Sequence, residues 1–134
     1  MLTTRFDVET VRRSFTPRSE WKPFPRATDR EAWQALLASP LNRERRGFLV
    51  GQAEALLGEP WPVLPATTYM EFVRNGNRSR YETPYFKRRR RLGILVLAEC
   101  WEGQGRFLDE IANGLWAISE EASWSVPAHA RNAP

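Results

Sequence analysis

Four residues near the C-terminal end of the chain could bind or transform a polar ligand: Glu120, Glu121, Trp124 and His129. His129 is the only histidine, and its imidazole could bind a carboxylate or act as an acid or base. The two glutamates are expected at the end of a helix, where a negative charge opposes the helix dipole. This misfit indicates either a functional role or an ion pair. The alternative for His129 is that it lies in a loop and has no functional role.

Several other residues invite comparison with these four. If the two glutamates are structural, we expect Arg106 or Arg78 as their ion-pair partner. Tyr69 and Tyr81 each carry a phenol, but no base lies nearby in the sequence to activate either, so packing is the simpler prediction. Trp116 falls at helical spacing with apolar neighbours and is predicted to lie in or near the core.

A run of five cations, Lys87 to Arg91, could bind an anion such as phosphate or sulfate. Five successive helical positions wrap more than one full turn, so these side chains cannot all face one ligand. We therefore predict a belt that points mainly outward into solvent. The turn Gly103-x-Gly105 is not a phosphate loop, because no strand precedes it.

The composition excludes several classes of protein. The chain has 134 residues, a formal net charge of +4 and 42% hydrophobic residues, which predicts a globular domain. No apolar run reaches the roughly 20 residues that a membrane span needs, so we expect no membrane partner. One cysteine, Cys100, and one histidine make a disulfide framework or a transition-metal site implausible, and no cofactor is expected. Met1 to Val8 lacks an apolar signal region, which favours a cytoplasmic location.

The elements that must position these residues begin after an N-terminal arm. Residues 1–28 contain three prolines, which favour an extended backbone from Ser19 to Arg26. Trp21 and Phe24 are expected to pin this arm onto the rest of the protein. Thr28, followed three residues later by Glu31, has the spacing of a capping box and predicts the start of a short helix.

Residues 29–134 are predicted to be helical. Ser39 and Pro40 can open a helix that Gly58 and Pro60 end. Residues 67–73 are expected to form a short strand or an ordered loop. A further helix should start at Thr83 and Pro84 and run from about residue 85 to 101. It is apolar nearly all round from Leu92, which predicts burial on most sides. The last helix shows an apolar stripe formed by Phe107, Leu108, Ile111, Ala112, Leu115 and Ile118. A short turn joins these two helices, and we expect them to pack as an antiparallel hairpin in an all-α protein.

An ordered series of short motifs resembles the N-terminal part of heparinase II/III-like proteins, which are relatives of polysaccharide lyases. The resemblance covers about Trp21 to His129, most of the chain. The series is Tyr69-x-Glu71-Phe72, Gly76-Asn77-Arg78-x-x-Tyr81-Glu82, Tyr85-Phe86-x-Arg88-Arg89, Leu97-Ala98-Glu99, Glu102-Gly103-x-Gly105-Arg106-Phe107 and Trp116-x-x-x-Glu120-Glu121-x-Ser123-Trp124-x-x-Pro127-Ala128-His129.

The resemblance implies an α/α toroid, in which antiparallel helix hairpins surround a central axis, here incomplete. Active full-length relatives cleave uronic-acid-containing polysaccharides by β-elimination, using a base, a group that neutralises the uronate carboxylate and an acid. The family's catalytic tyrosine and histidine generally lie further along the toroid, and Ala130 stands where an Asn is expected. The chain therefore corresponds to a truncated or incomplete lyase-like protein that should not be catalytic alone, and its sequence identifies no catalytic residue.

Within this interpretation an acidic polysaccharide or oligosaccharide is the expected partner. Trp124 would stack on a sugar ring, Glu120 and Glu121 would bind sugar hydroxyls, and His129 would bind a carboxylate or move a proton. Arg88 and Arg89 match family positions, which favours internal pairing, for example with Glu82 or Glu121.

Two alternatives from other classes stay open. The first is a non-catalytic carbohydrate-binding or scaffold module. The second is a basic helical nucleic-acid-binding domain, which is weaker because the basic run lacks an adjacent aromatic platform beyond Tyr85 and Phe86. Exposed helix faces of an open toroid also predict self-association.

Overall fold

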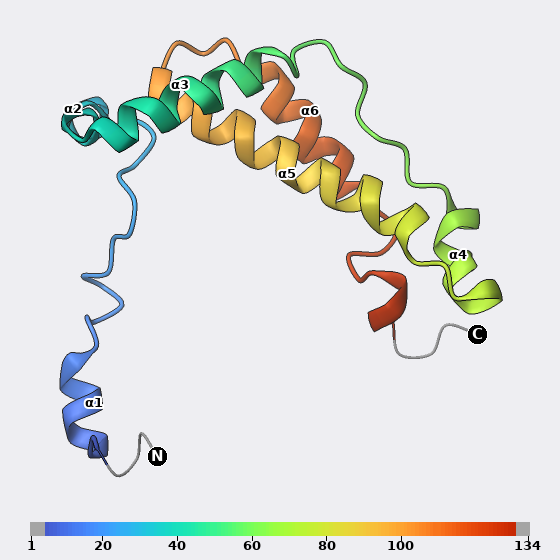
Figure 1. Ribbon diagram of the computed structural model, residues 1–134, viewed down its shortest axis with the longest axis horizontal. Helices are drawn as coiled ribbons and strands as arrows, with labels where there is room; N and C mark the ends of the chain where they lie inside the picture. The colour runs from blue at the N-terminus through green and yellow to red at the C-terminus, as the bar shows by residue number, and fades with distance from the viewer. Residues whose placement is uncertain (1–4, 131–134) are drawn as a thin grey trace.

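The computed structural model describes residues 5–130, and within this range the protein is helical and contains no strand. Residues 1–4 and 131–134, which end the two predicted segments, lie outside the described residues. Figure 1 shows three long helices packed side by side, with the N-terminal segment running away from them. Among residues 5–130, no helix is long and apolar enough to span a bilayer.

The N-terminal segment contains one short helix, α1 (Val8–Ser14). Asp7 caps it, since its carboxylate accepts the backbone N–H of Thr10 at 2.7 Å. Trp21 and Phe24 further along are 64% and 74% exposed, so the prediction that they pin the arm to the protein is wrong. The prolines restrict the backbone locally, but they do not set the direction in which the arm leaves the helices.

The next helices are α2 (Arg30–Ala35), the short 3-10 turn η2 (Leu36–Ala38) and α3 (Pro40–Glu54). Asp29 rather than Thr28 caps α2, one residue later than predicted, and its carboxylate accepts the N–H of Ala32 at 3.1 Å. Helix α3 starts at Pro40 after Ser39, as the sequence predicts, although the Ser39 hydroxyl makes no capping hydrogen bond.

Residues 66–75 form a helix, α4 (Ala66–Asn75), and the predicted strand or loop at 67–73 is wrong. The carbonyl of Pro65 accepts the N–H groups of Thr68 and Tyr69, which starts the first turn. Gly76 ends the helix with φ 76°, a left-handed conformation that glycine adopts without strain. Pro65 directly precedes the helix, a position where a proline is compatible with a helix start.

The longest helix, α5 (Ser79–Glu102), begins before the predicted start at Thr83. Asn77 caps it through a hydrogen bond from the N–H of Arg80 to the Asn77 side-chain oxygen at 3.2 Å. Pro84 consequently lies inside the helix, where it cannot donate a hydrogen bond. Tyr81 and Tyr85, on either side of Pro84, are buried, 4% and 5% exposed.

Helix α5 is the centre of the fold, with α3 and α6 (Leu108–Ser119) packed along it in the opposite direction (Figure 1). The core where these helices meet consists of Ala53, Leu95, Ala98 and Phe107, all fully buried. The helices α3 and α6 leave part of the α5 surface exposed to solvent. Val96 and Leu97 are 38% and 39% exposed, so the predicted burial on most sides is wrong.

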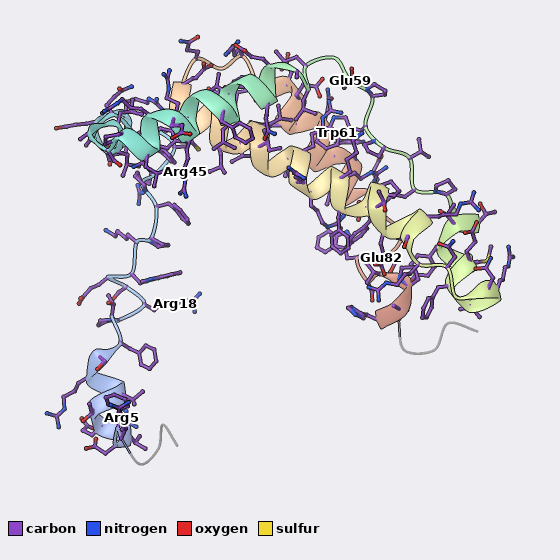
Figure 2. The ribbon with its side chains drawn as sticks, viewed as in Figure 1. Arg5, Arg18, Arg45, Glu59, Trp61 and Glu82 are labelled. Carbon is purple, nitrogen blue, oxygen red and sulfur yellow. The ribbon has the colours of Figure 1, made fainter. Side chains whose placement is uncertain are left out.

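Helix α6 is rotated about its own axis relative to the orientation that its apolar stripe predicts. Gly114 is its buried residue, and the six-membered ring of Trp61 fills the space that a Cβ at Gly114 would need (Figure 2 labels Trp61). Glu110 also faces inward and accepts the Trp61 indole N–H at 3.1 Å. Leu115 and Trp116 therefore point outward, 53% and 70% exposed, and the predicted core position of Trp116 is wrong. The predicted stripe holds for Phe107 and Ile111, which belong to or pack against the core, and is wrong for Leu108 and Leu115.

The turn between α5 and α6 is fixed by hydrogen bonds. The Glu99 carboxylate accepts the N–H groups of Gly105 at 2.6 Å and Phe107 at 3.2 Å. Arg30 of α2 donates to the final carbonyls of α5, those of Cys100 at 2.7 Å and Trp101 at 3.0 Å. These bonds satisfy backbone groups that a helix end leaves unpaired.

Candidate functional site

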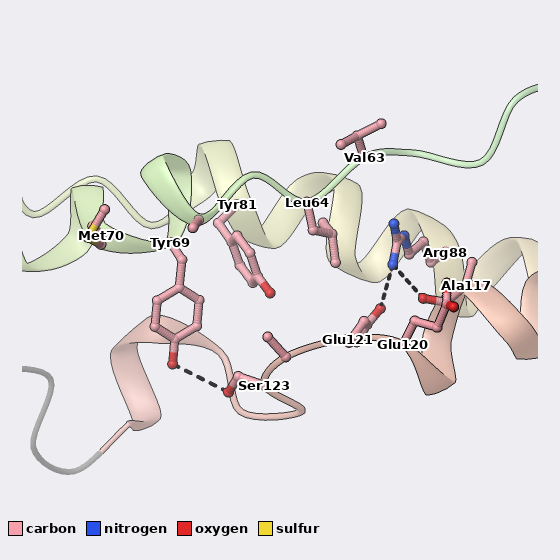
Figure 3. A pocket seen from close by; sticks show the side chains of 12 residues that line it. Val63, Leu64, Tyr69, Met70, Tyr81, Arg88, Ala117, Glu120, Glu121 and Ser123 are labelled. Carbon is pink, nitrogen blue, oxygen red and sulfur yellow. Dashed lines mark hydrogen bonds and ion pairs between the residues drawn. The ribbon is translucent and has the colours of Figure 1, made fainter.

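A pocket of about 550 Å³ lies where α4, α5 and the end of α6 meet (Figure 3). Two tyrosines, one arginine, two glutamates and a serine supply its polar groups, and small and aliphatic side chains supply the rest. The lining residues are Val63, Leu64, Ala66, Tyr69, Met70, Tyr81, Arg88, Ala117, Glu120, Glu121, Ala122 and Ser123. A volume of this size accommodates a small ligand.

Glu121 forms the floor of the pocket and is held by two arginines of α5. Its side chain is 1% exposed, and its carboxylate lies 3.2 Å from Arg88 and 2.6 Å from Arg89. The expected internal pairing of these arginines is confirmed for Glu121, whereas Glu82 pairs with Arg78 at 2.9 Å. Two cations around one carboxylate make a buried ion-pair network, which is costly to break on one side only.

Arg106 is not a partner of the site glutamates. It pairs with Glu54 and Glu102 at the opposite end of α5, at 2.7 and 2.6 Å. The prediction that Arg106 or Arg78 pairs with Glu120 or Glu121 is therefore wrong. Many arginines and lysines of the sequence could form an ion pair with these glutamates. Only the packing of α6 against α5 selects Arg88 and Arg89.

The same network fixes the loop that follows α6. The Arg89 guanidinium lies 3.3 Å above the centroid of the Tyr85 ring, a cation–π contact. The Tyr85 hydroxyl donates to the carbonyl of Trp124 at 2.7 Å. Arg88 donates to the carbonyls of Pro62 and Ala117, both at 2.7 Å, which ties the segment before α4 to the end of α6. The pocket walls are therefore rigidly connected through α5.

Two tyrosines line the pocket and pack edge to face, with ring centroids 5.0 Å apart. The hydroxyl of Tyr69 lies 3.5 Å from the Ser123 hydroxyl, while that of Tyr81 points into the pocket and makes no hydrogen bond with any residue in the described range (Figure 3). Burial, reinforced by the negative charge of Glu121, raises the pKa of Tyr81 above its ordinary value. Tyr81 is therefore a neutral phenol at physiological pH, able to donate a hydrogen bond to a ligand.

The structure divides the four predicted site residues into two pairs. Glu120 and Glu121 line the pocket, Glu120 as an exposed side chain at its rim. Trp124 and His129 do not line it. Trp124 directly follows the lining residue Ser123, is 69% exposed and donates its indole N–H to the Ile118 carbonyl at 3.2 Å. His129 is exposed and belongs to the 3-10 turn η3 (Pro127–His129), which packs against α4.

Reasoning from sequence missed the tyrosines and Arg88 as pocket residues. Tyr81, Tyr85 and Arg88 occur at positions i, i+4 and i+7, which place three polar-tipped side chains on one helix face. That spacing was a usable signal, but the helix had been predicted to start only after Tyr81. Tyr69 was hidden by the prediction of a strand or loop at 67–73.

The basic run divides between two faces of α5. Lys87 and Arg90 are exposed, whereas Arg91 is 3% exposed and lies over the Trp61 ring. Arg91 donates to the carbonyls of Leu56, Glu59 and Pro60 and to the Glu110 carboxylate, at 2.7 to 3.1 Å. The predicted outward orientation is therefore wrong for Arg91, and also for Arg88 and Arg89, whose side chains are 12% and 30% exposed.

Within residues 5–130, no three His, Cys, Asp or Glu side chains are grouped so that they could hold a metal ion. The pocket can supply a phenol donor, a guanidinium and a carboxylate acceptor, a set suited to a polar ligand with hydroxyl and acidic groups. The chain matches no protein-family profile, and no curated protein matches it significantly.

Proposed function

We propose that the chain is the N-terminal toroid segment of a heparinase II/III-like protein and that its pocket binds part of an acidic polysaccharide. The observation that carries this proposal is the Tyr81 hydroxyl, unpaired among the described residues, in a pocket shared with Arg88 and Glu120. A phenol and a carboxylate match sugar hydroxyls, and a guanidinium matches a uronate carboxylate.

Elimination from a uronic acid needs a base, a group that neutralises the carboxylate and an acid. The raised pKa of Tyr81 suits a hydrogen-bond or proton donor and opposes a role as base at neutral pH. Arg88 can contribute positive charge, although Glu121 balances part of it. No described residue of the pocket is an imidazole, and we propose that the segment binds without turning substrate over, while a lyase reaction belongs to a longer parent protein.

A non-catalytic carbohydrate-binding or scaffold module is the second candidate. The exposure of Trp124, beside the pocket residue Ser123, favours it, because an exposed indole can stack on the C–H face of a sugar. Both candidates bind carbohydrate. They differ in whether the protein belongs to a lyase. The nucleic-acid candidate loses support, since three cations of the basic run, Arg88, Arg89 and Arg91, are engaged inside the protein.

Binding and turnover are tested together with alginate, heparan, chondroitin and hyaluronan oligosaccharides. Tryptophan fluorescence reports binding, and ultraviolet absorbance reports the conjugated double bond that elimination leaves. We expect saturable binding to at least one oligosaccharide and a flat absorbance trace. Tyr81→Phe should weaken binding by roughly three- to tenfold, the value of one hydrogen bond, and Trp124→Ala by a similar factor.

Trp21→Ala is the matched control, because this indole is also exposed but lies in the arm. It should leave the affinity unchanged. Absence of binding to the whole panel would contradict the proposal. An absorbance rise that disappears in His129→Ala would instead show that the short chain is a complete lyase with His129 in its site.

A further inference from the structure

We propose that the outward face of α6 in one copy of the chain docks into the groove between α3 and α5 of a second copy. This interaction is separate from the pocket and does not depend on the proposed function. It rests on two exposed surfaces that are both partly apolar and carry opposite charge.

The receiving face is a groove of about 420 Å³ between α3 and α5. Gln52, Ala55 and Leu56 form one wall, and Lys87, Arg90, Arg91 and Ile94 form the other. Gln52 lies in the last turn of α3, and Ala55 and Leu56 follow that helix directly. The residues of the other wall have the i, i+3, i+4, i+7 spacing of one face of α5. The groove therefore has the form that accepts an amphipathic helix.

The groove continues as an apolar surface beyond its lining residues. Phe48 and Leu41, 64% and 52% exposed, stand seven and fourteen positions before Ala55, at the spacing of one helix face. Leu97 extends the α5 wall by one turn beyond Ile94 and is 39% exposed. Contiguous exposed apolar surface of this kind indicates an interaction site.

The cations of this face are available to a partner. Arg45 of α3 and Lys87 and Arg90 of α5 are exposed and make no ion pair with any residue from 5 to 130. Arg45, labelled in Figure 2, lies between Leu41 and Phe48 on the helix face that leads into the groove. Arg91 closes the base of the groove, and its Nε atom is buried without a hydrogen-bond partner.

Helix α6 carries the complementary face. Its outward side presents Leu108, Leu115 and Trp116, which are 55%, 53% and 70% exposed. Asp109 lies beside this stripe, and α6 contains no lysine or arginine. An acidic amphipathic helix and a groove with unpaired cations attract each other and fix their mutual register.

The two faces belong to different parts of the protein, so the contact is head to tail. Each copy offers one groove and one α6, and such an interface produces closed rings or open chains of subunits. This geometry permits a decisive experiment, because each face can be disabled in a different variant. The variants are Lys87→Glu with Arg90→Glu in the groove, and Asp109→Lys with Leu115→Arg on α6.

Analytical ultracentrifugation of the full chain measures the outcome over a range of protein concentrations. We expect wild-type protein to form dimers and larger species as concentration rises. Each double variant alone should associate at least about tenfold more weakly. An equimolar mixture should form a one-to-one heterodimer that does not grow, because one intact α6 meets one intact groove.

Arg18→Glu with Lys22→Glu is the matched control, a double charge reversal at exposed positions of the arm. It should associate like wild type. A monomeric wild type, or a mixture that shows no heterodimer, would overturn the proposal. Association that all three double variants retain would also overturn it and indicate nonspecific aggregation. A monomer whose groove cations bind a sulfated oligosaccharide would assign the groove to a carbohydrate instead.

Discussion

The Arg89 guanidinium of α5 contacts the Glu121 carboxylate at 2.6 Å, although the two residues are 32 positions apart in the sequence. Glu121 is almost completely buried, and Arg88 contacts it from the same helix. Because this network joins α5 to the loop after α6, it holds the wall of the candidate site in place. Substitutions that break this network should therefore lower the free energy of unfolding even when no ligand is present.

Glu121→Gln should lower the free energy of unfolding by about 3 kcal/mol, since it leaves two arginines near a neutral amide in a buried position. Urea denaturation followed by circular dichroism measures this change. The adjacent and exposed Glu120→Gln is the control and should change stability by less than about 0.5 kcal/mol. Equal effects of the two substitutions would show that the Arg88–Arg89–Glu121 network contributes nothing specific.

Arg91→Met should also be strongly destabilising, by about 3 kcal/mol or more. It removes the donor for three backbone carbonyls and leaves the Glu110 carboxylate without its cation. The neighbouring Arg90→Met keeps the charge change but removes an exposed side chain, so it should be nearly neutral at low protein concentration. A stable Arg91→Met protein would contradict the structural role assigned to this arginine.

Two glycines of the α5 region should respond in opposite directions to alanine. Gly103 has φ 65° and lies against the Arg30 guanidinium, so Gly103→Ala should cost about 1–2 kcal/mol. Gly93 is inside α5 with open space around it, and Gly93→Ala should stabilise the protein by about 0.5–1 kcal/mol. Thermal unfolding of both variants would reveal the predicted opposite shifts in Tm, and shifts of the same sign would contradict this assignment.

Stability should fall at alkaline pH in part through Tyr81. Its pKa is raised in the folded protein above the ordinary value of 10.0, chiefly by burial. As pH rises past this ordinary value, the unfolded chain loses the Tyr81 proton first, so the unfolded state gains stability relative to the folded state. The stabilising contribution is complete below that pH and is lost as pH approaches the folded-state pKa.

Tyr81→Phe removes this titrating group. Denaturation measured at several alkaline pH values should therefore show a shallower loss of stability in Tyr81→Phe than in wild type. In an ultraviolet titration of the tyrosines, this variant should also lack the component that ionises at the highest pH. Identical pH profiles for the two proteins would show that Tyr81 ionises at its ordinary pKa.

Local rules predicted some helix boundaries and failed at others. Ser39 and Pro40 fix the start of α3 because a proline suits the first helical turn. The start of α5 was misplaced for the same reason, since Pro84 suggested a first turn and the Asn77 cap was overlooked. Pro84 lies within the first turns of α5, between the buried residues Tyr81 and Tyr85.

The candidate site was predicted in part. Glu120 and Glu121 were identified from their position at a helix end, and both line the pocket. Tyr81 was predicted only to pack, because no base lies near it in the sequence, whereas the pocket places it beside Tyr69 and Glu121 from other segments. A pocket depends on which segments meet, and the spacing of residues within one segment does not reveal that.

Local sequence patterns were enough to predict a helical protein and a turn at Gly103. Backbone hydrogen bonds and φ preferences act over a few residues, so local composition is enough to specify them. Only the tertiary structure decided the rotation of α6, set by Trp61 against Gly114, and the choice of Arg88 and Arg89 as partners of Glu121. These features depend on burial and on charges brought together from distant segments, which no single stretch of sequence contains.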